Sequence, residues 1–250
     1  MPENHAVIVQ DAHLSGNPED ESVVRFHRFI HSVRDFGAHL IINGDLFEFW
    51  FEYRRAIPKH AYVTLSKLSR LVEEGTRLTI IGGNHDRWTR TRRQNFWKEQ
   101  IGADFFRKET VLDIAGMKTL VCHGDGFKEP DFSARITHRI IGHPLTEKIF
   151  GLVHPDLGIP LVNGFSALLS KKKKHEASAQ QRAADTQETL ALELLEKRTD
   201  LDLAVFGHTH VPKLIAKGKN RWYMNPGAWV DDFRFATISP DGPQLRRFEE

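Results

Sequence analysis

Cysteine is nearly absent from this chain of 250 residues, which contains only Cys122. An intrachain disulfide is therefore excluded, and a single thiol suits a reducing compartment. No apolar run reaches the ~18 residues that a membrane-spanning helix needs. The residues that follow Met1 have neither the basic nor the apolar region of a secretory signal. We therefore expect a cytoplasmic protein.

An excess of charge of one sign is also missing, because 35 basic residues stand against 33 acidic ones and the formal net charge is +2. This balance argues against a dedicated nucleic-acid-binding protein and against an acidic disordered chain, so we expect no nucleic-acid partner. Hydrophobic residues make up 40% of the chain, which is enough for a core. The length suits one large domain, or one domain that carries an insertion.

Five short segments share one pattern, in which an aliphatic run leads directly into a polar cluster. The runs are 6–9, 40–42, 78–81, 119–121 and 203–206, and the clusters are 11–13, 43–45, 82–86, 122–125 and 207–210. Aliphatic runs bounded by Gly and Asn are typical of buried strands. Each polar cluster is therefore expected to lie where a strand ends.

Helical spacing of apolar residues fills the first two gaps between these strands. One helix is expected from about Asn17-Pro18 to Val33, and another from Tyr62 to Val72, ended by Gly75. This alternation predicts an α/β fold, in which ligands gather at the carboxyl ends of the strands. The clusters can then converge on one site, although they are spread from residue 11 to residue 210. Beyond them, a hairpin (213–216 with 222–224) and a strand at 235–238 predict an antiparallel C-terminal part.

Residues from about 127 to 198 fit neither pattern. This stretch is apolar and helical in texture, is cut by three prolines, contains Lys171–Lys174 and ends in a helix from about Ser178 to Arg198. We interpret it as a helical cap, inserted within a single domain of residues 1–250 and placed to cover the site.

The clusters hold seven side chains that commonly ligate metals: Asp11, His13, Asp45, Asn84, His123, His208 and His210. Oxygen and imidazole donors without a thiolate exclude a cysteine-type zinc site and suit Mn²⁺, Fe or Zn²⁺ better than Ca²⁺. Seven ligands are too many for one ion with an open position, but they suit two ions ~3.5–4 Å apart that share a carboxylate. We expect two divalent ions, with Mn²⁺ as the first choice and Fe or Zn²⁺ as alternatives. A water between them would ionise near neutral pH and attack a phosphate ester in line.

His85 and Asp86 directly follow Asn84 in the third cluster. We expect His85 to act as a catalytic acid or charge stabiliser beside the leaving oxygen, and Asp86 to hold its ring in one orientation. Taken singly, a histidine at a strand end is usually a cap or a surface residue, and an Asn-His or Gly-Asp pair is usually a turn. The occurrence of all five clusters together favours the functional interpretation.

The five clusters resemble the signature of the calcineurin-like metallophosphoesterases: Asp-x-His, Gly-Asp, Gly-Asn-His-Asp, a histidine after the fourth strand, and Gly-His-x-His. The resemblance implies a β-sandwich flanked by helices, in a four-layer α/β arrangement. It implies His85 as the catalytic histidine and Asn84 and His85 as substrate contacts. It also implies a first metal held by Asp11, His13, Asp45 and His210, and a second held by Asp45, Asn84, His123 and His208, with Asp45 as the bridge.

A narrower resemblance concerns the substrate. The segment 45–53, the residues His123-Gly124-Asp125-Gly126 and the apolar insertion are similar to the UDP-2,3-diacylglucosamine hydrolases, from the first strand to Trp229. This implies a pyrophosphatase of lipid A synthesis that yields UMP and 2,3-diacylglucosamine 1-phosphate, and peripheral contact with inner-membrane lipid. One large branch of those enzymes has arginine at the position of His85 and another keeps histidine. The substrate therefore depends on the insertion and the aromatic segment.

Several alternatives stay open at this point. The insertion either forms an apolar cleft for acyl chains or only packs on itself, and its lysines either attract phosphate or form a solvated face. The aromatic residues of 47–53, and Trp88, either fill the core or line the substrate cleft. The competing function is a soluble metallophosphoesterase that acts on nucleotides, phosphodiesters or phosphoproteins. A non-catalytic scaffold is disfavoured, because every expected ligand and His85 are present.

Overall fold

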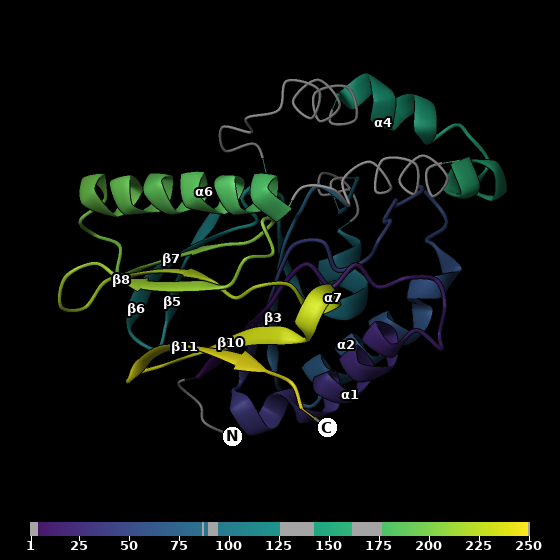
Figure 1. The fold of residues 1–250 in the computed structure, drawn as a ribbon. Helices are drawn as coiled ribbons and strands as arrows, with labels where there is room; N and C mark the ends of the chain where they lie inside the picture. The colour runs from purple at the N-terminus through teal and green to yellow at the C-terminus, as the bar shows by residue number, and fades with distance from the viewer. Residues whose placement is uncertain (1–4, 87, 90–94, 126–142, 162–176, 250) are drawn as a thin grey trace.

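The computed structural model of the chain describes residues 5–86, 88–89, 95–125, 143–161 and 177–249 (Figure 1). Its described strands form two sheets. The first has the order β11-β10-β1-β2-β3-β4, in which β1 to β4 are parallel and β10 runs antiparallel to β1. Its strands are β1 (Ala6–Val9), β2 (His39–Asn43), β3 (Arg77–Ile81), β4 (Asp104–Phe106), β10 (Arg234–Ser239) and β11 (Gly242–Arg247).

The second sheet has the order β5-β6-β7-β9-β8, with a parallel centre and two antiparallel edges. Its strands are β5 (Thr110–Ile114), β6 (Met117–Cys122), β7 (Leu203–Phe206), β8 (Lys213–Ala216) and β9 (Trp222–Asn225). The five predicted strands that lead into polar clusters, the C-terminal hairpin and the strand at 235–238 are therefore confirmed. The strands β4, β5 and β11 were not predicted, because β4 has only three residues and the polar residues of β5 and β11 interrupt their apolar runs.

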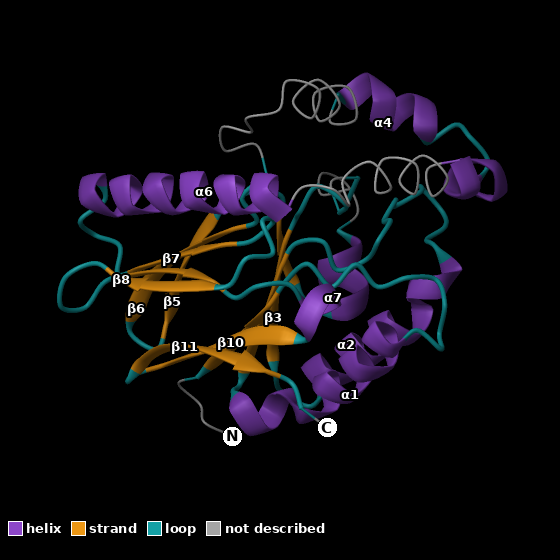
Figure 2. Cartoon of the chain, viewed as in Figure 1, coloured by secondary structure: helices purple, strands orange, loops and turns teal. Residues whose placement is uncertain are grey.

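Helices cover both outer faces of the paired sheets, with α1 and α2 on one side and α6 on the other (Figure 2). These are α1 (Glu21–Phe36), α2 (Tyr62–Glu73) and α6 (Ala177–Lys197); short elements are η1 (Lys59–Ala61), η2 (Trp97–Ile101), α4 (Pro144–Phe150) and α7 (Trp229–Asp232). Three apolar clusters fill the spaces between the layers: one under α1 and α2, one between the sheets and one under α6. The expected four-layer α/β sandwich is confirmed.

The helix α1 begins later than the sequence suggested. Asp20, rather than Asn17-Pro18, caps it, since the Asp20 carboxylate accepts a hydrogen bond from Ser22 N at 3.0 Å. Its buried face then repeats at helical spacing through Phe26, Phe29 and Val33, which pack on the first sheet.

The helix α6 was expected as part of the cap, but the structure places it elsewhere. Its buried Ala191 and Leu195 pack against Phe206 and Tyr223 of the second sheet. The helix is therefore the outer layer of the sandwich. Of the remaining insertion, the structure describes α4 and a helical segment at 155–161, and α4 lies apart from both sheets (Figure 1). The predictions for 127–142 and for Lys171–Lys174 fall outside the described residues.

None of the described helices combines the length and the apolar character that spanning a membrane requires.

Candidate metal centre

The polar clusters lie at the carboxyl ends of strands from both sheets, as the sequence predicted. β1, β2 and β3 of the first sheet lead into the clusters at 11–13, 43–45 and 82–86, and β6 and β7 of the second sheet lead into those at 122–125 and 207–210. Backbone hydrogen bonds fasten the first two clusters together, from Asp11 N to Gly44 O at 3.1 Å and from His13 N to Asp45 O at 2.9 Å. The site is thus assembled where the two sheets meet.

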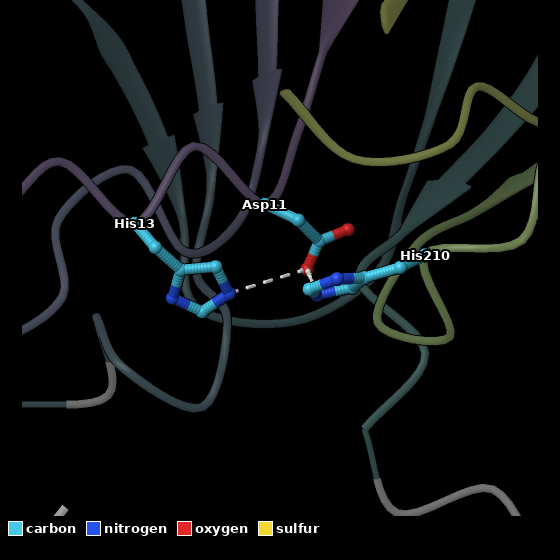
Figure 3. A group of neighbouring side chains, drawn as sticks. All are labelled: Asp11, His13 and His210. Atoms are coloured by element: carbon cyan, nitrogen blue, oxygen red, sulfur yellow. Dashed lines mark ion pairs between the residues drawn. The ribbon is translucent and has the colours of Figure 1, made fainter. Parts of the chain in front are cut away.

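The structure brings all seven expected ligand residues together. Asp11, His13 and His210 form one group of ligand atoms within 4.8 Å of one another, and Asp45, His123 and His208 form another. We call these the first and second triads. In the first triad, Asp11 lies between the two imidazoles, with Oδ1 at 3.5 Å from His210 Nε2 and 4.0 Å from His13 Nε2 (Figure 3).

Short contacts join the two triads. His123 Nε2 lies 3.3 Å from Asp45 Oδ2 and 3.8 Å from Asp11 Oδ1, and the seventh residue, Asn84, places Oδ1 at 3.3 Å from the same nitrogen. Asp45 Oδ2 also lies 3.8 Å from His13 Nε2. The Asp45 carboxylate therefore faces both triads, which is the position that a bridging ligand requires.

The buried carboxylates test whether these residues fit a cation. Asp11 and Asp45 are almost fully buried, and Asp11 Oδ1 accepts no hydrogen bond of normal geometry from the described part of the chain. Buried, unpaired carboxylate oxygens are costly unless a cation or hydrogen bonds compensate them. Two imidazole nitrogens face Asp11 Oδ1 without forming a hydrogen bond of normal geometry, His210 Nε2 at 3.5 Å and His123 Nε2 at 3.8 Å, so the donors are arranged as ligands that share a cation. Carboxylate, amide and imidazole donors together fit divalent ions.

The electrostatics of the site lead to the same conclusion. Burial alone would lower the pKa of His123, but the carboxylates of Asp45 and Asp11 raise that pKa well above its ordinary value. Burial would likewise lower the pKa of His210, yet the neighbouring carboxylates of Asp11 and Asp231 raise it to about 10. Two imidazoles therefore hold protons in a field that attracts positive charge, and cations bound there would displace those protons.

Backbone strain is concentrated at these residues. Of the seven non-glycine residues with positive φ in the described part of the chain, five are expected ligands: Asp11, His13, Asp45, His208 and His210. Such conformations persist where the surrounding structure imposes them, and they cluster at functional sites. Two glycines admit the close approach of the ligands. A Cβ at Gly83 would lie 2.2 Å from Asp45 Oδ1, and one at Gly44 would lie 2.3 Å from His123 Nδ1.

His85 belongs to the same cluster, because its ring nitrogen forms a third group of ligand atoms within 4.8 Å of one another, together with His13 and Asp45. Its backbone N donates to Asp45 Oδ1 at 2.8 Å, and its Nε2 lies 4.0 Å from Asp45 Oδ2. Its Nδ1 hydrogen-bonds to the backbone carbonyl of Glu48. A carbonyl only accepts, so Nδ1 carries the hydrogen and Nε2 is the nitrogen that faces the ligands.

The expected role of Asp86 in orienting this ring needs correction, since the Glu48 carbonyl is the hydrogen-bond partner of the ring. Asp86 Oδ2 instead accepts from Leu46 N at 3.3 Å, so that it supports the loop that follows Asp45. Burial, and then the charge of Asp45, raise the pKa of Asp86 to about 7. The Glu48 contact could not be predicted from the sequence, because a backbone carbonyl leaves no residue-type signal.

Sequence reasoning also missed the groups that support the ligands. Asn43 O accepts from His123 Nδ1 at 2.9 Å, and Asp231 Oδ2 lies 2.8 Å from His210 Nδ1. Gln187 of α6 donates to Gly207 O at 2.9 Å, behind the loop that carries His208 and His210. Asn43 belongs to the polar cluster 43–45, so the sequence pattern included it without assigning it this role. Gln187 and Asp231 were not detectable, because only the tertiary fold brings them to the site.

The aromatic residues of the segment 47–53 are packed in two separate buried apolar clusters. Phe47 and Trp50 belong to the core under α1 and α2, whereas Phe49, Phe51 and Tyr53 form a second cluster with Trp88 and Phe150. Phe150 ends α4, and its ring stacks on Trp88 with centroids 5.0 Å apart. This second cluster therefore anchors the insertion to the segment that follows Asp45.

The family model of the calcineurin-like phosphoesterases matches residues 8–212, a range that includes all five polar clusters. The chain belongs to this family. As a calcineurin-like phosphoesterase it is a metal-dependent phosphohydrolase, which agrees with the grouped carboxylates and imidazoles.

This calcineurin-like phosphoesterase is similar to curated hydrolases and to solved structures. The chain is 23% identical to a UDP-2,3-diacylglucosamine hydrolase of Porphyromonas gingivalis over 88% of each chain. It is 26% identical to a protein of the same name from Serratia proteamaculans over 98% of this chain and 99% of that one. Among solved structures, vacuolar protein sorting 29 of Cryptosporidium parvum matches with a TM-score of 0.49 and 14% identity, over 99% of this chain and 92% of that one.

Proposed function

We propose that this chain hydrolyses the pyrophosphate of UDP-2,3-diacylglucosamine and releases UMP and 2,3-diacylglucosamine 1-phosphate. The relatives that carry the name of this activity are similar over nearly the whole chain, including the insertion. The grouped carboxylates and imidazoles support cleavage of a phosphoester. The exposed leucines of the insertion support a substrate with acyl chains.

The observation that carries the choice of substrate is the apolar surface of the insertion. Leucines of α4 and of the following segments are solvent-exposed, with exposed fractions of 89% at Leu152 and 70% at both Leu157 and Leu161. Where such leucines form a continuous apolar patch, the patch marks a surface that binds a ligand, a protein or a membrane. Each acyl CH₂ that such a surface buries contributes about 0.8 kcal/mol.

This apolar surface is connected to the candidate catalytic residue by a short chain of contacts. The Glu48 carbonyl holds the His85 ring, and the next residue, Phe49, packs against Phe150 of α4 with ring centroids 5.9 Å apart. The insertion that carries the exposed leucines is thus attached to the same loop that positions His85. The same surface would allow peripheral contact with the cytoplasmic face of the inner membrane.

We assign the ligands to two divalent ions, preferably Mn²⁺. Asp11, His13 and His210 would hold one ion, Asn84, His123 and His208 would hold the other, and Asp45 would contact both. When bound, such a pair supplies Lewis acidity toward the phosphate oxygens and lowers the pKa of a water molecule. The glycines at 44 and 83 let the backbone approach closely enough to hold Asp45 between the triads.

His85 is assigned to the leaving group. With Nδ1 donating to the Glu48 carbonyl, only Nε2 is available to hold or release a proton on the side of the ligands. A protonated Nε2 next to the leaving oxygen would offset its developing charge. Asn84, whose amide lies at the edge of the second triad, is assigned with His85 to contact the substrate phosphate.

The test is a comparison of two substrates in the presence of Mn²⁺: UDP-2,3-diacylglucosamine, and the same UDP-sugar without its acyl chains. We expect UMP release with a much higher kcat/KM for the acylated substrate. The variant Leu157→Glu, which places a charge on the apolar surface, is expected to raise KM for the acylated substrate only. The variant Val111→Glu, on the exposed edge strand β5, serves as the matched control.

Equal kcat/KM for both UDP-sugars would remove the lipid substrate from the proposal. Fast turnover of nucleotides or simple phosphodiesters in the same assay would instead support a soluble phosphoesterase that uses the same ligands.

A further inference from the structure

His210 has a carboxylate on each side of its ring. Nε2 faces Asp11 Oδ1 at 3.5 Å, inside the first triad, and Nδ1 donates a hydrogen bond to Asp231 Oδ2 at 2.8 Å. Figure 3 shows the side of the ring that faces Asp11. Since Nδ1 is engaged by Asp231, the nitrogen free to ligate an ion is Nε2.

The carboxylate of Asp231 is held in place by the buried part of α7. Trp229 is fully buried, and its indole nitrogen donates to Ser22 O of α1 at 3.0 Å. Backbone hydrogen bonds run from Trp229 N to Gln10 O at 3.1 Å and from Val230 N to Asp11 O at 3.2 Å. The same short helix is therefore bonded to the segment that carries Asp11, which fixes Asp231 relative to the first triad.

Two other rings at the site also have Nδ1 on an oxygen, but these oxygens are neutral. His123 uses the carbonyl of Asn43 and His85 uses that of Glu48, whereas His210 uses a carboxylate. A carboxylate on the far nitrogen of a metal-binding imidazole fixes its tautomer and orientation and increases its basicity as a ligand. His210 therefore differs from His123 in the charge of its Nδ1 partner, a difference that no motif in the sequence indicates.

We propose that Asp231 is a positioning residue for the metal ion of the first triad, acting through His210 to orient the ring and strengthen its Nε2 as a ligand. The inference rests on the proposed metal site, but it does not depend on the identity of the substrate. Removal of Asp231 should then weaken one ion selectively and leave the ion of the second triad in place.

The experiment is a Mn²⁺ titration of the metal-free full chain, followed by electron paramagnetic resonance. In Asp231→Ala we expect one of the two sites to lose about 10–100-fold in affinity, the range typical of such partners. The remaining ion should then give the spectrum of an isolated Mn²⁺ in place of that of a coupled pair. Asp231→Asn keeps the shape and removes the charge, so it should weaken the same site by a smaller factor. Thermal unfolding of the metal-free variants should match that of the wild type.

Asp232→Ala is the matched control, because Asp232 lies on the same helix but pairs with Arg234 at 2.9 Å and Arg247 at 2.7 Å. It should keep both sites at wild-type affinity. The inference is overturned if both Asp231 variants bind two ions as the wild type does, or if Asp232→Ala loses as much. A wild-type chain that binds two ions but does not cleave the UDP-sugar would contradict the proposed function and leave this inference standing.

Discussion

Asp45 has the most demanding position of any single side chain at the site. Its carboxylate is almost fully buried and faces imidazoles of both triads, among them His13 and His123. Burial would raise its pKa, but His123 and His85 hold that pKa well below its ordinary value, so Asp45 is ionised near neutral pH. A buried charge of this kind needs cations around it.

We predict that Asp45→Asn removes both ions together, because the Asp45 carboxylate is a ligand of both candidate sites. The loss should exceed the ~10–100-fold that follows removal of an indirect partner. Metal content after dialysis against a Mn²⁺ concentration that saturates the wild type would measure it. Asp113→Asn, on the exposed edge strand β5, is the control. Retention of one ion at full occupancy would refute the bridge.

A second prediction concerns His85, which contacts Glu48 and groups with His13 and Asp45, but which we assign to the leaving group and not to a metal ion. His85→Ala should reduce kcat by roughly 10²–10⁴-fold, the usual contribution of general acid–base catalysis. Its metal content should stay at the wild-type level. Loss of an ion in this variant would show that His85 is a ligand and that its role has been misassigned.

A third prediction follows from the raised pKa of His210, about 10 in the metal-free chain. At pH 7 the ring is protonated, so an ion that binds Nε2 must displace a proton. Metal affinity should therefore rise with pH, by about tenfold per pH unit for each proton displaced. Calorimetric titrations in buffers of different ionisation enthalpy would count the protons released. An affinity independent of pH between about 6 and 8 would contradict the assignment.

Among the structural elements, α4 is attached to the rest of the described chain through an aromatic cluster. Phe150 lies against Phe51, with centroids 4.8 Å apart, and stacks on Trp88, and this cluster is the apolar anchor of α4. Because α4 lies apart from both sheets, no layer of the sandwich replaces these contacts (Figure 1). The orientation of the apolar surface toward the metal ligands therefore depends on this anchor.

We predict that Phe150→Ala releases α4 without disturbing the sandwich. Truncation of a buried phenylalanine costs about 3–5 kcal/mol, and here the loss falls on the attachment of the insertion. Hydrogen exchange in 143–161 should accelerate, while Mn²⁺ affinity stays unchanged. Leu152→Ala, at an exposed position of the same insertion, should alter neither. Unchanged exchange in Phe150→Ala would mean that other contacts hold α4.

At the level of the whole molecule, the candidate ligands come from both sheets, so bound ions would join the two sheets. Asp11, Asp45 and Asn84 follow strands of the first sheet, and His123 and His208 follow strands of the second. The sequence predicted this convergence, because each of these residues directly follows an aliphatic run and a parallel strand fixes the edge at which the run ends. At these five residues, the position predicted from the sequence pattern agrees with the position in the fold.

The predictions that were wrong or missing concern contacts between segments far apart in the sequence, which only the tertiary structure shows. The apolar stripe of α6, which includes Ala191 and Leu195, shows that the helix is buried on one face but not which sheet it covers. Asp231 reads as an ordinary acidic residue until α7 places it beside His210. The Glu48 carbonyl, which replaced Asp86 as the partner of His85, carries no residue-type signal.

The most direct test of the two-ion site is anomalous diffraction from crystals of the full chain grown with Mn²⁺. Two peaks are expected about 3.5–4 Å apart, the spacing of two-metal hydrolases, with the Asp45 carboxylate in contact with both. A single peak, or peaks located away from Asp11, Asn84 and His208, would contradict the account.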